Sequence, residues 1–256
     1  MKFSRLLLPF SLVLPLAGCA KSPSGGGPVN NAPNRLQVTL NLKGTLSTRA
    51  YYAVAFDDDA LREGPKAIVS GSRQNDAVTP LNGVANGSFR FIVVYSPEGF
   101  TVYRRPDPTS PNLEVPERTN LPFVSGRLPV ASANAINFTL DLDARDGSGN
   151  FYFAHDASGQ FTPTQLKINA IATTRPFRNP DTRIKPVDAL GGAPAQTSTP
   201  ETFLVGGTRR ATINDDFGSA DRNDYDHGSF DNTNDPDYVN FNQLDIKTLD
   251  LILTRG

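Results

Sequence analysis

The sequence is poor in the residues that most catalytic and metal sites need. Its 256 residues include one cysteine, two histidines and no tryptophan. Because Cys19 is the only cysteine, an intramolecular disulfide and a multi-cysteine metal site are excluded. The Gly-x-Ser-x-Gly, His-Glu-x-x-His and Cys-x-x-Cys motifs and the glycine-rich phosphate loops are absent as well. The common hydrolase, zinc, redox and nucleotide-binding classes therefore lack sequence support, and we lean toward a protein without catalysis.

The chain also lacks a hydrophobic run long enough to span a bilayer. An apolar run, Leu6–Leu16, follows Lys2 and Arg5, but it contains two prolines and falls short of the roughly 20 residues of a spanning helix. It ends in Leu16-Ala17-Gly18-Cys19, whose small residues are typical of a cleavage site. A basic start, a short apolar run and such a site together predict an export signal.

The motif Leu16-Ala17-Gly18-Cys19 resembles the lipobox of bacterial lipoprotein signal peptides, and the resemblance is limited to this segment. It implies removal of residues 1–18 and acylation of Cys19, which becomes the lipidated N-terminus. Two or three acyl chains hold a protein stably on a membrane, whereas one does so only marginally. Ala20 stands where an aspartate commonly marks retention at the inner membrane. The resemblance thus implies a cell-envelope location outside the cytoplasm, at the outer membrane if the cell has two.

Residues 19–34 would join this anchor to the folded domain. Residues 20–34 contain three glycines, three prolines and almost nothing to bury, which is typical of a flexible tether. Such a chain spans roughly 20 Å on average. Cleavage would also remove two basic residues, and the slightly negative remainder does not suggest a nucleic-acid partner.

Alternation of apolar and polar residues predicts β-strands in the rest of the chain. Leu36, Val38, Leu40 and Leu42 alternate with polar residues over eight positions, and residues 134–143 repeat the pattern. No amphipathic helix of 10 or more residues is evident, while 21 glycines and 21 prolines punctuate the chain. We therefore expect residues 35–256 to form one all-β domain, an antiparallel β-sandwich with long irregular loops, although the periodicity fits other antiparallel architectures. The predicted strands are 36–43, 50–56, 88–95, 100–104, 134–143, 151–154, 165–174 and 244–254.

The segment Asp215–Tyr238 is unusually rich in aspartate and asparagine. Carboxylate and amide oxygens suit calcium, which takes six to eight oxygen ligands. The spacing Asp224-x-Asp226-x-Gly228 lacks the further ligands of an EF-hand, and the alternative is a solvated acidic loop without a ligand. Calcium is thus the one cofactor to consider, and otherwise we expect none. The candidate ligands are Asp215, Asp216, Asp221, Asp224, Asp226 and Asp231.

Two further long irregular stretches, residues 104–129 and 175–200, could form a binding rim if they gather at one end of the sandwich. A faint echo between Asn86-Gly-Ser-Phe-Arg-Phe and Gly149-Asn-Phe-Tyr-Phe raises the alternative of two lobes. Such short matches arise by chance in a β-rich chain, so a single domain is preferred.

Candidates for catalysis are few. His155 could join Asp156 and a serine in a triad, but a histidine at a strand end is more often a half-exposed turn residue. Paired carboxylates could serve a glycosidase, yet nothing singles out two. The carboxylates considered are Asp57, Asp59, Glu98 and Asp141.

Three classes of function remain. The preferred class is a lipid-anchored envelope protein, a binding or structural module that meets an envelope protein or glycan. The second is a carbohydrate-binding or calcium-binding module, for which Tyr51 and Tyr52 offer aromatic rings but the absence of tryptophan counts against sugars. The third is an envelope hydrolase that uses aspartates or His155.

Overall fold

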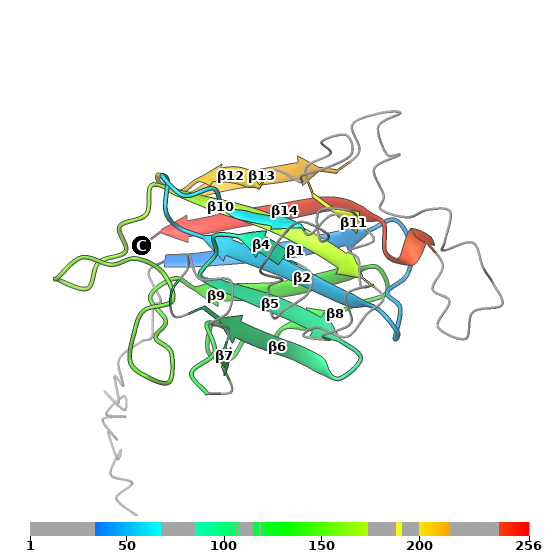
Figure 1. Ribbon diagram of the computed structural model, residues 1–256, viewed down its shortest axis with the longest axis horizontal. Helices are drawn as coiled ribbons and strands as arrows, with labels where there is room; N and C mark the ends of the chain where they lie inside the picture. Colours follow the sequence, from blue (N-terminus) through cyan, green and yellow to red (C-terminus); the bar gives the residue numbers. More distant parts are fainter. Residues whose placement is uncertain are drawn as a thin grey trace, which may run out of the picture. The chain divides into compact units, whose positions relative to one another are not determined.

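The computed structural model describes eight stretches of the chain, and within them there is no α-helix. Two antiparallel sheets pack face to face (Figure 1), which confirms the predicted β-sandwich. No helix in these stretches is long and apolar enough to cross a membrane. Cys19 and the tether lie outside the described residues. The described residues are 34–67, 85–105, 107, 115–117, 119–173, 188–190, 200–215 and 241–255.

Sheet A contains the first and the last strand of the sandwich side by side. β1 (Asn34–Leu42) pairs antiparallel with β14 (Ile246–Arg255) on one edge and with β9 (Ala135–Asp141) on the other, along nearly its whole length. Leu36 faces Leu253 in β14 and Leu140 in β9, so three buried leucines form one row across the sheet. The strand order is β13 (Arg209–Asn214), β14 (Ile246–Arg255), β1 (Asn34–Leu42), β9 (Ala135–Asp141) and β8 (Val130–Ala131).

Sheet B lies opposite, with β2 between β10 and β5 near its centre. A short hairpin of β3 (Pro65–Ala67) and β4 (Ala85–Gly87) forms a separate two-stranded sheet, and a single 3₁₀ turn, η3 (Phe241–Gln243), precedes β14. β12 (Glu201–Leu204) pairs with β10 on the same edge as β11. The strand order is β11 (Asp188–Ala189), β10 (Gln165–Thr173), β2 (Tyr51–Asp57), β5 (Phe91–Ser96), β6 (Gly99–Arg104) and β7 (Val115–Glu117).

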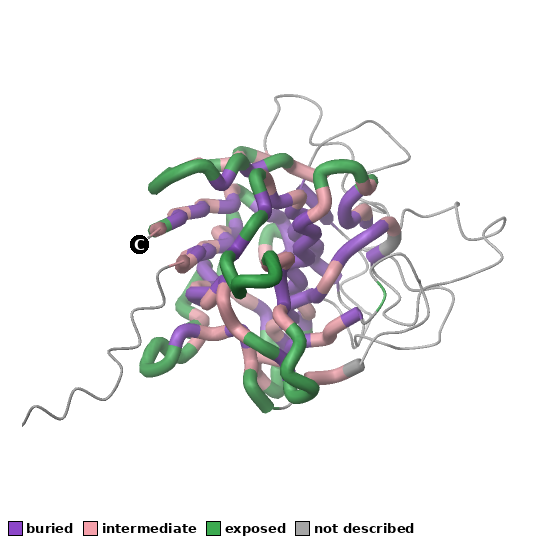
Figure 2. Tube along the Cα trace, turned by 90° about the vertical axis from the view of Figure 1, so that its left-hand side faces the viewer, coloured by how far each residue is buried: buried purple, intermediate pink, exposed green. Residues whose placement is uncertain are grey.

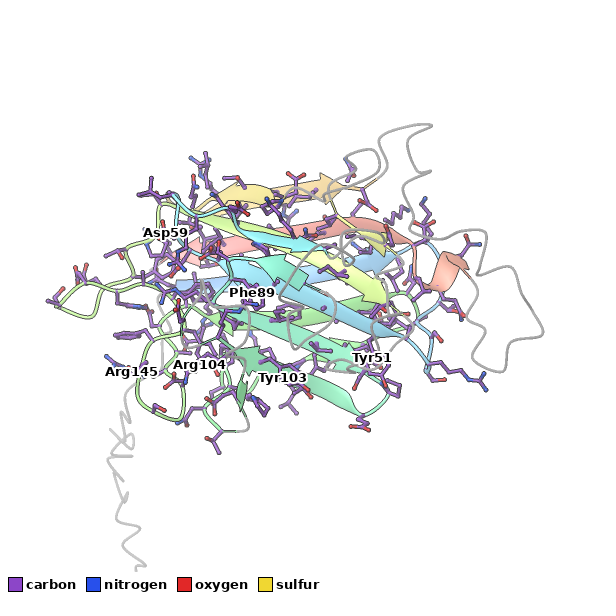
Figure 3. The ribbon with its side chains drawn as sticks, in the orientation of Figure 1. Tyr51, Asp59, Phe89, Tyr103, Arg104 and Arg145 are labelled. Carbon is purple, nitrogen blue, oxygen red and sulfur yellow. The ribbon has the colours of Figure 1, made fainter. Side chains whose placement is uncertain are left out.

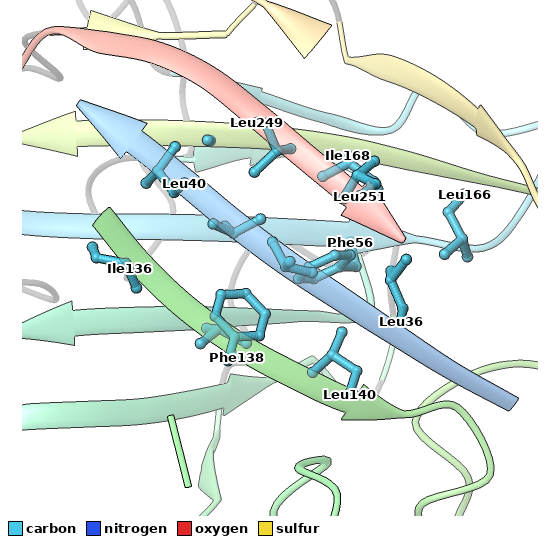
Figure 4. Packing of buried hydrophobic residues seen from close by; sticks show 14 of the residues in the cluster. Leu36, Leu40, Phe56, Ile136, Phe138, Leu140, Leu166, Ile168, Leu249 and Leu251 are labelled. Atoms are coloured by element: carbon cyan, nitrogen blue, oxygen red, sulfur yellow. The ribbon is translucent and has the colours of Figure 1, made fainter. Parts of the chain in front are cut away.

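The main core fills the space between the two sheets (Figure 4). The Phe56 ring stacks on Phe91 of the same sheet, with centroids 5.1 Å apart, and meets Phe138 of sheet A edge-on at 6.3 Å. Each fully buried Leu or Phe contributes roughly 1.5 to 3 kcal/mol by leaving water. The alternating leucines of β1 therefore supply one wall of the core, as their period of two predicts.

The outer faces of the two sheets differ. Sheet A alternates buried and partly exposed residues along β1 and β14, as a half-solvated sheet does. The central strands of sheet B are buried on both faces, because Ala53, Ala55 and Ile92 point away from the main core and pack with Ala67 and Ala85 of the β3–β4 hairpin. The outer face of sheet B thus carries a third layer, which the sequence analysis did not predict.

Some predicted strands were wrong. Residues 151–154 form no strand but lie between two tight turns. β12 and β13 were missed, because β13 is an edge strand whose burial pattern contains no fully buried residue. The C-terminal strand, predicted at 244–254, is confirmed as β14. Truncation at Leu244 would remove all of β14, which lies between β13 and β1, and should therefore destroy the fold.

The two ends of the sandwich are named here by the course of β1. At the proximal end β1 begins, and Asn34 faces Arg255 of β14. At the distal end β1 finishes, and Leu42 faces Ile246. Both the start of β1 and the C-terminus lie on the left in Figure 1, and Figure 2 looks onto this proximal end.

Polar clamps join the sheets at the distal end. The Tyr52 hydroxyl donates to the Gln243 carbonyl oxygen at 2.8 Å and accepts from the Ser47 backbone N–H at 3.0 Å. The Asp188 carboxylate accepts from the Ile246 N–H at 2.5 Å. Burial raises the pKa of Tyr52 to about 12. The neutral phenol is therefore the form that the folded state holds.

We expect Leu251→Ala to lower the free energy of unfolding by about 2 to 5 kcal/mol, because Leu251 is a fully buried core residue of β14. Ile252→Ala is the matched control, since the neighbouring side chain points to the outer face and is partly exposed. Its cost should be roughly 1 kcal/mol or less. Equal costs in chemical denaturation would contradict the register of β14.

The Tyr52 clamp should make the fold sensitive to alkali. The pKa of an unfolded tyrosine is 10.0, and the folded value is about 12. Stability from this group is complete below pH 10 and falls by about 3 kcal/mol as pH rises through 12. Tyr52→Phe should lose roughly 1 kcal/mol at neutral pH but show a shallower alkaline decline in denaturation experiments. Tyr51→Phe should make the decline shallower by less, because burial raises the pKa of the half-buried Tyr51 as well but the side chain holds no such clamp.

Candidate functional site at the proximal end

Two seven-residue turns with the same sequence pattern follow each other at the proximal end. Residues 145–151 read Arg-Asp-Gly-Ser-Gly-Asn-Phe, and residues 155–161 read His-Asp-Ala-Ser-Gly-Gln-Phe. In each, the first and last residues form an antiparallel bridge. The repeat of Asp-x-Ser-Gly-x-Phe at a ten-residue spacing therefore builds two equivalent turns, named here the tandem turns.

The aspartate of each tandem turn organises the backbone. Asp146 Oδ1 accepts from the N–H groups of Ser148 and Asn150, at 2.8 and 2.9 Å. Asp156 Oδ1 accepts in the same way from the second and fourth residues that follow it, both at 2.9 Å. Gly149, with φ 84°, adopts the left-handed conformation that glycine tolerates best. The pattern is thus explained by turn chemistry.

An aromatic column runs through the tandem turns. The Arg145 guanidinium lies 3.5 Å from the centroid of the Phe151 ring, and the His155 ring stacks on Phe151 at 3.6 Å with an interplanar angle of 12°. Phe161 meets His155 edge-on at 5.9 Å. The two turns therefore pack on each other through their rings, with Arg145 exposed at the outside.

Both ring nitrogens of His155 face acceptors. Nδ1 lies 3.0 Å from the carbonyl oxygen of Phe153, and Nε2 lies 3.0 Å from Asp143 Oδ1. With an Asp143 carboxylate, only the imidazolium form can donate to both. The His155 side chain is 1% exposed. Asp143 also accepts from the Asn34 amide at 3.2 Å, so the histidine is linked to the first residue of β1.

These contacts do not assemble the triad considered from the sequence. Asp156 is exposed and accepts hydrogen bonds from its own turn, including one from the Ser158 hydroxyl at 2.6 Å, whereas His155 pairs with Asp143. The hydrogen bond from Ser158 is the main reason that the pKa of Asp156 lies below its usual value. Because both nitrogens of His155 are engaged, neither is open to take a proton from a serine.

The three consecutive aspartates at the end of β2 are each paired. Asp57 is buried, accepts from the Ser88 hydroxyl at 2.6 Å and lies 3.6 Å from Arg62 Nη1. Asp58 pairs with Arg90 Nε at 2.7 Å and accepts from the Ala154 N–H, which ties β2 to the tandem turns.

Asp59 pairs with Arg62 at 2.8 Å, and this hydrogen bond lowers the pKa of Asp59. Burial raises the pKa of Asp141, partly offset by the hydrogen bond from the Asp143 N–H. Glu98 lies in the β5–β6 turn at the distal end. The carboxylates considered for a glycosidase are thus not brought together as one pair.

An ion pair with β6 holds the first tandem turn in place. Arg104 Nε lies 2.8 Å from Asp146 Oδ2, which is buried, and Glu117 Oε2 accepts from the Gly147 N–H at 3.2 Å. Tyr152 is buried beside them, and burial raises its pKa. Its hydroxyl has no hydrogen-bond partner within the described part of the chain. Figure 3 places Arg104, Arg145 and Asp59 at the same end and Tyr51 at the other.

The predicted calcium ligands are only partly visible. Asp215 is described, and its N–H donates to the Lys247 carbonyl oxygen at 3.1 Å. Among the residues that the structure describes, no group of three or more histidine, cysteine, aspartate or glutamate side chains is arranged for a metal ion. Calcium binding by the acidic segment stays a prediction. The remaining candidates, which lie outside the described residues, are Asp216, Asp221, Asp224, Asp226 and Asp231.

The fold and these contacts define an antiparallel β-sandwich with an ion-paired end. Comparison of the chain with protein-family models, with curated proteins and with solved structures found no match in any of the three. The arrangement at the proximal end must therefore be interpreted from its own chemistry.

Sequence reasoning missed the tandem turns, although their signal is present. The echo between Asn86-Gly-Ser-Phe-Arg-Phe and Gly149-Asn-Phe-Tyr-Phe joins two different structures, because the first runs from the end of β4 to the start of β5 and the second begins in a turn. The stronger repeat is the ten-residue spacing of Asp146 and Asp156. Asp143 was not singled out as the partner of His155, because that contact depends on how the chain folds back.

The tandem turns supply a matched pair of substitutions. We expect Asp146→Asn to lower the free energy of unfolding by about 3 kcal/mol, since it leaves the Arg104 charge without its buried partner. Asp156→Asn keeps the same turn contacts at an exposed position and should stay within the error of a denaturation experiment. Similar losses for both variants would show that turn geometry, and not the ion pair, sets the cost.

Proposed function

We propose that the chain is a lipid-anchored cell-envelope protein, in which the β-sandwich serves as a binding or structural module without catalysis of its own. The observation that carries the proposal is the motif Leu16-Ala17-Gly18-Cys19 behind a basic start and a short apolar run. The tether predicted from the sequence would join Cys19 to β1, which begins at Asn34. The membrane is thus the first partner, reached through the anchor.

The contacts at the proximal end support a role without catalysis. A general base needs a lone pair that can reach a substrate, and both nitrogens of His155 are engaged. The carboxylates of Asp57 and Asp58 accept hydrogen bonds and pair with arginines. These groups stabilise the turns on which they lie.

The distal end is the better candidate for a partner. Thr173 and Asp188 flank residues 174–187, and Asp215 and Phe241 flank residues 216–240, and all four flanking residues lie at the distal end. Connections of this length in a compact domain often carry function. In the cell envelope, the partner bound at the distal end would be an envelope protein or a glycan. Tyr52 is not available as a sugar platform, because its ring is buried.

Membrane fractionation tests the proposed anchor. The full-length wild type, expressed in a bacterium that processes lipoproteins, should sediment with membranes and resist extraction by high salt. Cys19→Ala should move the protein to the soluble or unprocessed fraction, because no acyl chain can be attached. Ser22→Ala in the tether is the matched control and should behave as the wild type. A Cys19→Ala protein that remains mature and membrane-bound would refute the anchor.

A further inference from the structure

We propose that the proximal end of the sandwich rests on the bilayer surface, with Leu61 at the headgroup level and Arg145 and Arg209 facing lipid phosphates. This inference rests on the proposed lipid anchor at Cys19. It goes further, because an anchored domain on a tether could present any face to the membrane, and here one end is assigned.

The reach of the tether favours the proximal end. β1 begins there at Asn34, so the chain from Cys19 joins the sandwich at that end. A chain of this length and composition spans roughly 20 Å on average. The ten residues of β14 give the sheet a length of about 33 Å. Turning the distal end to the bilayer would require the tether to pass along the whole sheet, well beyond its average span.

The turn between β2 and β3 carries an apolar side chain at its apex. Leu61 is 97% exposed, the highest value among the large exposed hydrophobic residues described. Lys167 Nζ donates to the carbonyl oxygens of Ala60 and Arg62, so the turn is held on both sides of Leu61. A leucine held at the apex of a turn can leave water by entering the apolar boundary of a bilayer.

Leu61 and Leu204 both belong to the proximal end. Asp58 in the β2–β3 turn accepts from Ala154 of the tandem turns, and those turns connect to Asn34 through Asp143. Leu204, 51% exposed, ends β12 and faces Gln165 at the start of β10. The other two large exposed hydrophobic residues lie near the edge of sheet A. Leu128 precedes β8, and Val130 is the first residue of β8.

The charges of this end suit an anionic surface. Arg145 and Arg209 are exposed, and their guanidinium groups donate to the carbonyl oxygens of Gly149 and Gly206, at 2.7 and 2.8 Å. No described carboxylate forms an ion pair with either arginine. Among the partly or fully exposed acids of this end, Asp59 pairs with Arg62, whereas Asp156 is held by hydrogen bonds from its own turn. Two exposed guanidinium groups at the same end as the apolar Leu61 suit lipid phosphates over acyl chains.

A single introduced thiol can report which end meets lipid. Cys19 is the only native cysteine and is acylated in the anchored protein, so Leu61→Cys supplies one free thiol for an environment-sensitive fluorophore. The labelled full-length protein is placed in anionic vesicles whose lipids carry bromine on the acyl chains. The label at 61 should be quenched about twofold more than the same label at Leu128→Cys, beside β8 at the edge of sheet A, or at Glu98→Cys in the distal β5–β6 turn. Arg145→Glu in the Leu61→Cys chain should reduce the quenching.

Flotation of the same samples separates the two proposals. Protein that does not float with vesicles contradicts the lipid anchor. Protein that floats but shows equal quenching at the three sites, or the greatest quenching at position 98, overturns the orientation and leaves the anchor standing. A label at 61 that is shielded from water without quenching by bromine indicates a protein or a second copy at this end, and also overturns the proposal.

Discussion

The sandwich depends on the pairing of β1 with β14, because that pairing places the first and last strands of the domain in the middle of one sheet. The inward leucines of β1 then cover Phe56 and its neighbours in sheet B. Most of the chain lies between the two strands in sequence, so their pairing closes a very long loop. The conformational entropy lost on closing that loop must be offset by burial of apolar side chains in the core. The two strands must therefore fit each other closely in register, and their alternating leucines provide that fit.

Sheet B meets a different constraint, because its central strands are buried on both faces. Small residues make this arrangement workable: Ala53 and Ala55 leave room for the β3–β4 hairpin to approach the sheet. Asn169 is buried on the same face, and its amide donates to the Pro65 carbonyl oxygen at 3.1 Å. A polar contact under an apolar layer fixes where the hairpin lies, since a buried amide without a partner would be costly.

The sequence could predict sheet A better than the rest for a physical reason. A strand with one solvated face must alternate, and Leu36 to Leu42 do so strictly. A strand buried on both faces is a continuous apolar run without alternation. The sequence of β2 therefore did not indicate that a third layer covers its outer face. An edge strand such as β13 shows little apolar signal at all. The aromatic run Phe151–Phe153 imitates a strand, although Phe151 stacks on His155 of the second turn and the next two rings meet Phe91 in the main core.

In the candidate site as well, contacts between neighbours in sequence could be predicted, and contacts between distant segments could not. Asp146 and Asp156 organise their own turns, so their role is written in the adjacent residues and could have been found from the repeat. The pairing of His155 with Asp143 requires the first tandem turn to fold back, and no local pattern specifies it. The same distant contacts join the turns to β1 through Asn34 and to β2 through Asp58. Hydrogen bonds and ion pairs among the polar groups of the proximal end hold its turns in one arrangement. A fixed arrangement suits a contact surface better than a pocket that must open to bind and release a ligand.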